Sequence, residues 1–165
     1  MISELWTWAE ANTGLPVIWA NQNGPQPEPP YVTLNVIATS REGLPYIGEV
    51  DETGLVVIGQ GQLFTLSLQV YGEGVTGAVQ GLRDSLERIT VQRDLRSSGF
   101  AYVRVLSEPQ DVPEITGTTW QQRANMDIQF RAARDITDDV GLIETVAHDG
   151  GDGNASGAGA ITGGA

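Results

Sequence analysis

The chain is 165 residues long, which fits one domain with a hydrophobic core. Hydrophobic residues make up 40% of it and include four tryptophans, so a disordered chain is excluded. Its 21 acidic residues outnumber nine basic ones, all of them arginine, and the net charge of −12 disfavours binding to free nucleic acid. The lack of cysteine excludes disulfides, thiolate catalysis and cysteine-ligated metals.

No stretch approaches the roughly 20 apolar residues that a membrane-spanning helix needs. The first residues also lack the basic start and the apolar run of a secretory signal. We therefore expect a soluble protein with no membrane partner, whose mature chain begins at or near Met1.

The first segment, residues 2–13, is predicted to be a helix, with Ser3 as its N-cap and Gly14 as its stop. The side chains expected to face inward are Leu5, Trp8 and Ala9. Residues 17–20 are predicted to form a short strand. The segment NQNGPQPEPP at 21–30 contains four prolines, which exclude both helix and central strand, so we expect a surface loop.

The next two segments include the part of the chain that we expect to project. YVTLNVIA at 31–38 alternates apolar and polar side chains, the period-2 pattern of a half-covered strand. REGLPYIGEVDETGLVVIGQG at 41–61 holds two short β-like pieces around residues 51–54, and is predicted to be a projecting hairpin. Four of its residues are too apolar to stand in water alone: Leu55, Val56, Val57 and Ile58.

Residues 62–71 alternate as cleanly, which predicts a strand with one core face and one face that is wet or contacts a partner. Helical spacing follows from 75 to 96, and Thr90–Val91 is the point at which we expect it to divide into two helices. The apolar stripe of this helical region consists of Val75, Val79, Leu82, Leu86 and Ile89.

Residues 100–107 are predicted to be a strand, and 108–119 a loop. The longest strand is expected at 120–131, and its alternation implies an antiparallel, twisted sheet. Its apolar face should hold Trp120, Gln122, Ala124, Met126, Ile128 and Phe130. The predicted class is α+β, with a mainly antiparallel twisted sheet, helices packed on one face and a projecting β-hairpin.

The motif Gly72-x-Gly74-x-x-Gly77 has the spacing of a dinucleotide-binding turn and lies between a strand and a helix. That fingerprint needs a buried parallel strand and further βαβ units. Here the preceding strand is half polar, and Glu73 would place a negative charge where the pyrophosphate binds. We therefore interpret the glycines as a tight strand-to-helix turn.

The only histidine, His148, precedes three residues that offer oxygen ligands for Ca²⁺: Asp149, Asp152 and Asn154. Their spacing misses the EF-hand loop, and no bidentate glutamate follows. The carboxylate pairs Asp51–Glu52 and Asp138–Asp139 are expected in solvated turns. No catalytic constellation can be assembled from spacing, so we predict no catalytic, cofactor-binding or metal-binding residues and no enzyme.

An N-terminal helix ending in glycine is followed by VIWANQNGPQPEPPYVTL, by FTLSLQVYG leading into a long helix, and by WQQRANMDIQF. In this order the segments resemble the neck or tail-terminator proteins of tailed bacteriophages, over roughly residues 5–146. That family offers no catalytic motif to carry over. The resemblance implies a homohexameric ring in the virion neck that caps the tail tube, terminates its polymerisation and joins the tail to the head-side connector.

The resemblance also implies the partners: other copies of the chain, the tail tube protein, the head–tail connector protein, and the sheath protein if the tail is contractile. DNA would only pass through the lumen, without specific binding, and assembly would take place in the host cytoplasm. Two alternatives stay open. One is a head-completion or connector subunit of the neck, and the other is a small nucleotide-binding or hydrolytic enzyme.

We expect a domain at 1–147 and a Gly/Ala-rich tail at 148–165, to which the resemblance does not extend. The tail should be a mobile coil in the free subunit, and its apolar residue Ile161 is expected to contact a partner in the assembled particle. A ring needs two different surfaces per subunit. We expect one of them on the hairpin, at Leu55, Val56, Val57 and Ile58.

Overall fold

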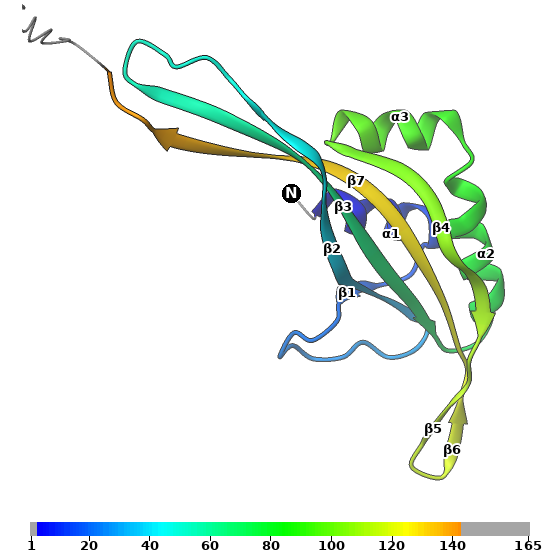
Figure 1. Ribbon diagram of the computed structural model, residues 1–165. Helices are drawn as coiled ribbons and strands as arrows, with labels where there is room; N and C mark the ends of the chain where they lie inside the picture. The colour runs from blue at the N-terminus through cyan, green and yellow to red at the C-terminus, as the bar shows by residue number, and fades with distance from the viewer. Residues whose placement is uncertain (1–2, 143–165) are drawn as a thin grey trace, which may run out of the picture.

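Five strands form one sheet in the computed structural model, which describes residues 3–142, and three helices lie against one face of that sheet (Figure 1). The order across the sheet is β1-β2-β3-β7-β4, and only the β1–β2 pair is parallel. The predicted α+β class with a mainly antiparallel sheet is confirmed. The helices are α1 (Ser3–Thr13), α2 (Val75–Ser85) and α3 (Ile89–Ser97). The strands are β1 (Val17–Trp19), β2 (Tyr31–Ile47), β3 (Leu55–Tyr71), β4 (Phe100–Asp111), β5 (Glu114–Thr116), β6 (Thr119–Gln121) and β7 (Arg123–Asp139).

The hydrophobic core lies between the helices and one face of the sheet. The α1 helix begins at Ser3, ends before Gly14, and buries the three residues predicted to face inward: Leu5, Trp8 and Ala9. The Trp8 ring meets Phe130 of β7 edge-on at a centroid distance of 6.2 Å, and Phe130 stacks on Phe64 of β3 at 5.7 Å. This aromatic group fixes α1 against the centre of the sheet.

The opposite face of the sheet carries polar side chains. Thr65 and Ser67 of β3 alternate with core residues, and their register partners on β7 are Gln129 and Asp127. The period-2 pattern read from the sequence is therefore correct for the body of this strand.

The helical region divides earlier than predicted, at residues 86–88 rather than at Thr90–Val91. The last turn of α2 tightens, since the amides of residues 86–88 each bond to the carbonyl three residues back, and the Gln92 side chain donates to the Leu86 carbonyl at 2.6 Å. The chain then changes direction. Ile89, assigned to the apolar stripe from its spacing, is 84% exposed, so that assignment was wrong.

The region expected to be a loop at 108–119 contains the end of β4 and most of a small hairpin formed by β5 and β6. Trp120 belongs to β6 of this hairpin and is 67% exposed, so it does not lie on the core face of a strand at 120–131. The strand itself begins at Arg123 and continues to Asp139, well past its predicted end.

Candidate assembly interface

Three strands leave the body of the domain together and form a long arm (Figure 1). We define the arm as residues 43–58 with residues 133–142. The predicted hairpin is present as the distal parts of β2 and β3, and β7 adds a third strand along β3 as far as the Leu55–Asp139 pair. The register places Ile47, Ile58 and Ile136 abreast across the three strands. Ile47 and Ile136 are exposed on either side of the half-buried Ile58, which makes this row a candidate for contact with another molecule.

Apolar side chains are concentrated on the arm. Of the fifteen exposed large hydrophobic residues found between residues 3 and 142, nine lie on it. They are Leu44, Tyr46, Ile47, Val50, Leu55, Val57, Ile136, Val140 and Leu142. A two- or three-stranded ribbon with this much exposed apolar surface gains stability when a partner covers it.

The four residues expected at the interface differ in their exposure. Leu55 and Val57 are 37% and 48% exposed, and they project from the same face of β3. Val56 is only 4% exposed and so has little surface left for a neighbour, while Ile58 is half-buried. Their role in an interface stays a prediction, for which the structure favours Leu55 and Val57.

The tip of the arm is held by one carboxylate. Asp51 accepts hydrogen bonds from the Thr53 amide at 2.8 Å, the Thr53 hydroxyl at 2.6 Å and the Leu55 amide at 3.0 Å. These bonds to the charged form, the Thr53 hydroxyl first, lower the pKa of Asp51. The predicted turn at Asp51–Glu52 is confirmed, and it has a structural role.

A second projection lies at the opposite end of the sheet from the arm (Figure 1). In the β5–β6 hairpin, Ile115 and Trp120 are register partners, and both side chains are exposed. An ion pair of 2.8 Å between Arg123 and Glu114 joins the hairpin to the start of β7. The sheet thus has a projection with exposed apolar side chains at each end.

The glycine motif forms a turn between β3 and α2. The β3 strand is antiparallel to both neighbours, which is not the arrangement of a dinucleotide-binding unit. Gly74 precedes α2 with φ 72°, and a Cβ atom on Gly72 would lie 2.8 Å from Cα of Pro30. The strand-to-helix turn predicted from the sequence is confirmed, and glycine is required there by conformation and by space.

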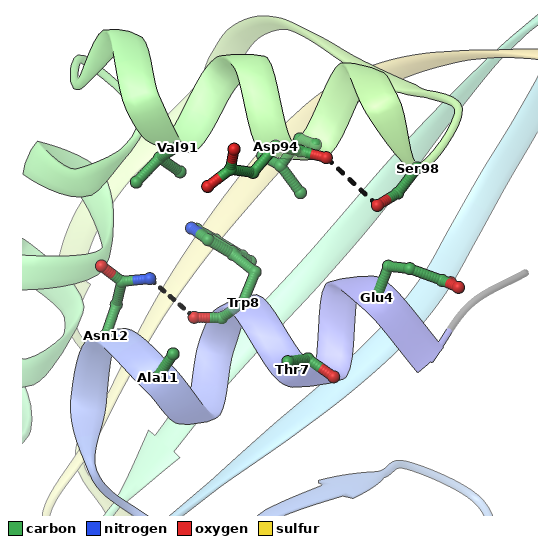
Figure 2. Close-up of a pocket in the computed structure, with 9 residues that line it drawn as sticks. Glu4, Thr7, Trp8, Ala11, Asn12, Val91, Asp94 and Ser98 are labelled. Atoms are coloured by element: carbon green, nitrogen blue, oxygen red, sulfur yellow. Dashed lines mark hydrogen bonds between the residues drawn. The ribbon is translucent and has the colours of Figure 1, made fainter.

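A groove of about 360 Å³ lies between α1 and α3. Figure 2 shows Trp8 in the groove, with residues of both helices around it. Several of its polar groups are already hydrogen-bonded: the Asn12 amide donates to the Trp8 carbonyl at 2.8 Å, the Ser98 hydroxyl to the Asp94 carbonyl at 3.1 Å, and the Trp8 indole to the Ser85 hydroxyl of α2 at 3.0 Å. The groove lies where α1 packs beside α3.

Within residues 3–142 no three histidine, cysteine or acidic side chains gather in a way that could hold a metal ion. Asp138–Asp139, expected in a turn, lies at the end of β7 instead. The candidate calcium ligands Asp149, Asp152 and Asn154, and also Ile161, lie outside the described residues. None of the described helices is long and apolar enough to cross a membrane.

The family model described as phage neck terminator protein matches residues 1–154. The chain belongs to this family. A search of curated proteins gave no match. As a phage neck terminator protein, the chain is a structural component of the virion neck, and it works by contact with other head and tail proteins.

Sequence reasoning missed two features of these surfaces, the third strand of the arm and the β5–β6 hairpin. The sequence does carry a sign of the longer third strand. No glycine or proline occurs between Gly117 and Gly141, so no strand-breaking residue ends β7 early. The signal for the hairpin was Gly117 between two short β-prone pieces, which the nearby prolines concealed.

Proposed function

We propose that this neck terminator protein forms a ring, of six copies by resemblance to its family, that caps the tail tube, stops its polymerisation and joins the tail to the connector. The observation that carries the proposal is the three-stranded arm, which holds most of the exposed apolar side chains of the described chain. In a cyclic ring, each subunit offers one surface to a neighbour and receives a different one. An arm that projects far from the body supplies the first of these surfaces.

The β5–β6 hairpin supports a contact in the other direction. It lies at the end of the sheet opposite the arm and exposes Ile115 and Trp120. If the arms join the copies within the ring, the hairpins are free to meet the tube protein or the connector. We propose a further contact with the adjoining ring through Ile161 of the tail.

The experiment is to assemble purified tail tube protein with and without the full chain, and to image the products by negative stain. We expect shorter tubes that carry a ring at one end when the chain is present. The variant Val57→Asp should leave tube growth unaffected, because a charge would be buried at the arm contact.

A head-completion or connector subunit gives a different result. The chain would then bind purified heads or connectors and leave the length and ends of the tubes unchanged. That outcome would overturn the capping role while leaving a structural role in the neck intact.

A further inference from the structure

Charge is unevenly distributed over the subunit, and the arm is strongly acidic. It carries six carboxylates and a single arginine, Arg134. The carboxylates are Glu49, Asp51, Glu52, Asp135, Asp138 and Asp139. The Asp51 carboxylate accepts hydrogen bonds within the turn, whereas Glu49 and Glu52 on either side of it are exposed to solvent.

The outward side of α3 has the opposite character. Ile89, Arg93 and Arg96 follow one another at spacings of four and three residues, so they lie on the same side of this helix. Leu95 faces the core from the other side. We call Ile89, Arg93 and Arg96 the α3 ridge. It places a largely exposed isoleucine at the N-terminal end of the helix and two guanidinium groups beyond it along the same side.

The arginines of the α3 ridge are weakly engaged within the described chain. Arg93 meets only its neighbour Asp94, at 3.4 Å with both side chains exposed, and Arg96 donates to the side-chain oxygen Oε1 of Gln92. By contrast, Arg83 pairs with Glu87 at 2.8 Å, and Arg123 pairs with Glu114 at the same distance. The ridge therefore retains positive charge in a chain whose net charge is −12.

The tip of the arm, residues 48–54, and the α3 ridge of the same subunit do not meet. Figure 1 shows the arm projecting away from the helices, so its tip lies far from α3 of the same chain. Contact between them requires two copies, the tip of one on the helix of the next. Such a pairing of two different surfaces is the heterologous contact from which closed rings are built.

We propose that the tip of the arm, residues 48–54, docks on the α3 ridge of a second copy of the chain. This inference rests on the proposed ring and names the surface that receives the arm. Glu49 and Glu52 accept hydrogen bonds from Arg93 and Arg96 of the neighbour, and Val50 covers Ile89. Exposed ion pairs are individually weak, so the charges set the orientation and the rate of docking, while apolar contacts of the arm supply most of the affinity.

The test is a charge swap followed by sedimentation velocity. The double variant R93E/R96E reverses the charge of the ridge and should weaken self-association by about tenfold or more. E49R/E52R reverses the charge of the tip and should have the same effect. The four substitutions together should restore association, because the attraction is re-established with opposite signs. Raising the salt concentration should weaken association of the native chain and of the swapped chain alike.

A matched control separates docking from net charge. R93E/R96E combined with E10R/E28R has the net charge of the native chain, but the new arginines lie on α1 and in the 21–30 loop. We expect it to stay dissociated. The neutral pair R93Q/R96Q should weaken association in the same direction, and circular dichroism should show native helix content in all variants, because the substituted side chains are exposed.

The outcomes distinguish the two proposals. A native chain that is monomeric at all concentrations would overturn the ring itself. A native ring that persists in both R93E/R96E and E49R/E52R would leave the ring standing and place the receiving surface elsewhere. If E10R/E28R restores the association of R93E/R96E as completely as E49R/E52R does, that result also contradicts docking at the tip.

Discussion

Arg131 of β7 and Glu42 of β2 form an ion pair across the intervening strand β3, with Nη2 of Arg131 2.5 Å from Oε1 of Glu42. The bridge is possible because the β3 residue paired with Glu42 is Gly61, which has no side chain. The hydrogen bonds to Glu42, and then its charge, raise the pKa of the Arg131 guanidinium. The pair lies next to the start of the arm and joins its two outer strands, β2 and β7, across β3.

This relationship predicts the behaviour of the arm. Arg131→Glu should speed amide hydrogen exchange in residues 43–58 several-fold, with a much smaller effect on the melting temperature, because exposed ion pairs contribute little to global stability. Glu42→Arg should act in the same way, and the two together should return exchange toward the native rate. Equal exchange in all four proteins would show that the pair does not hold the arm.

The turn at the tip should depend on Asp51. Asp51→Ala removes the acceptor of three hydrogen bonds, so the amides of Thr53 and Leu55 should exchange faster. Glu52→Ala is the matched control, since Glu52 is exposed and carries a charge in the same turn. Unchanged exchange in Asp51→Ala, or the same acceleration in Glu52→Ala, would contradict this role.

The same carboxylate predicts how the tip responds to acid. The pKa of Asp51 is lower in the folded chain than its ordinary value of 3.8, so its ionised form stabilises the turn above that pH. The stabilisation is lost as the pH falls below 3.8 and through the lower folded-state pKa. An NMR titration of the Thr53 and Leu55 amides should show this transition, and Asp51→Asn should abolish it.

A buried hydrogen bond joins α1 to α2. The Trp8 indole donates to the Ser85 hydroxyl at 3.0 Å, and both side chains are buried. Ser85→Ala leaves the indole N–H without its partner and should lower the free energy of unfolding by about 1–3 kcal/mol in urea denaturation. Ser97→Ala, at an exposed site on α3, should change it by less than about 0.5 kcal/mol. A value for Ser85→Ala as small as the control would contradict this contribution.

Alternation of side chains predicted the body of the sheet well. Side chains at alternate positions of 64–70 and 124–130 are apolar and buried in the core, because the helix layer covers that face. The first helix was predicted correctly for a similar reason, since Leu5, Trp8 and Ala9 share the side that meets Phe130.

The arm could not be predicted in full from the sequence, because its third strand lacks the alternation of apolar and polar side chains. Residues 132–139 are rich in alanine and aspartate, which are rare in strands, and they are held there by pairing with β3. Ile89 fitted the helical spacing of a continuous helix, but the break at 86–88 rotated it outward. A tertiary contact thus overrode the local pattern in β7, and local hydrogen bonds at the helix break did so at Ile89.

The β5–β6 hairpin should serve attachment between rings. Trp120→Ala removes its largest exposed side chain, and exposed tryptophans that become buried often dominate binding energy. We expect the variant to keep the native oligomeric mass but to co-sediment less with purified tails, while the neighbouring Thr118→Ala binds as the native chain does. Full binding by Trp120→Ala would exclude the hairpin from the contact.

The central claim is that the arm joins copies of the chain into a ring, and the oligomeric mass tests it most directly. Native mass spectrometry or light scattering should give the unmodified chain a single mass that is a multiple of 17.6 kDa, and six copies are expected. Val57→Asp should reduce this to folded monomers, and Val57→Thr, which keeps the shape of the side chain, should retain the ring. A monomeric native chain, or an intact ring in Val57→Asp, would contradict the account.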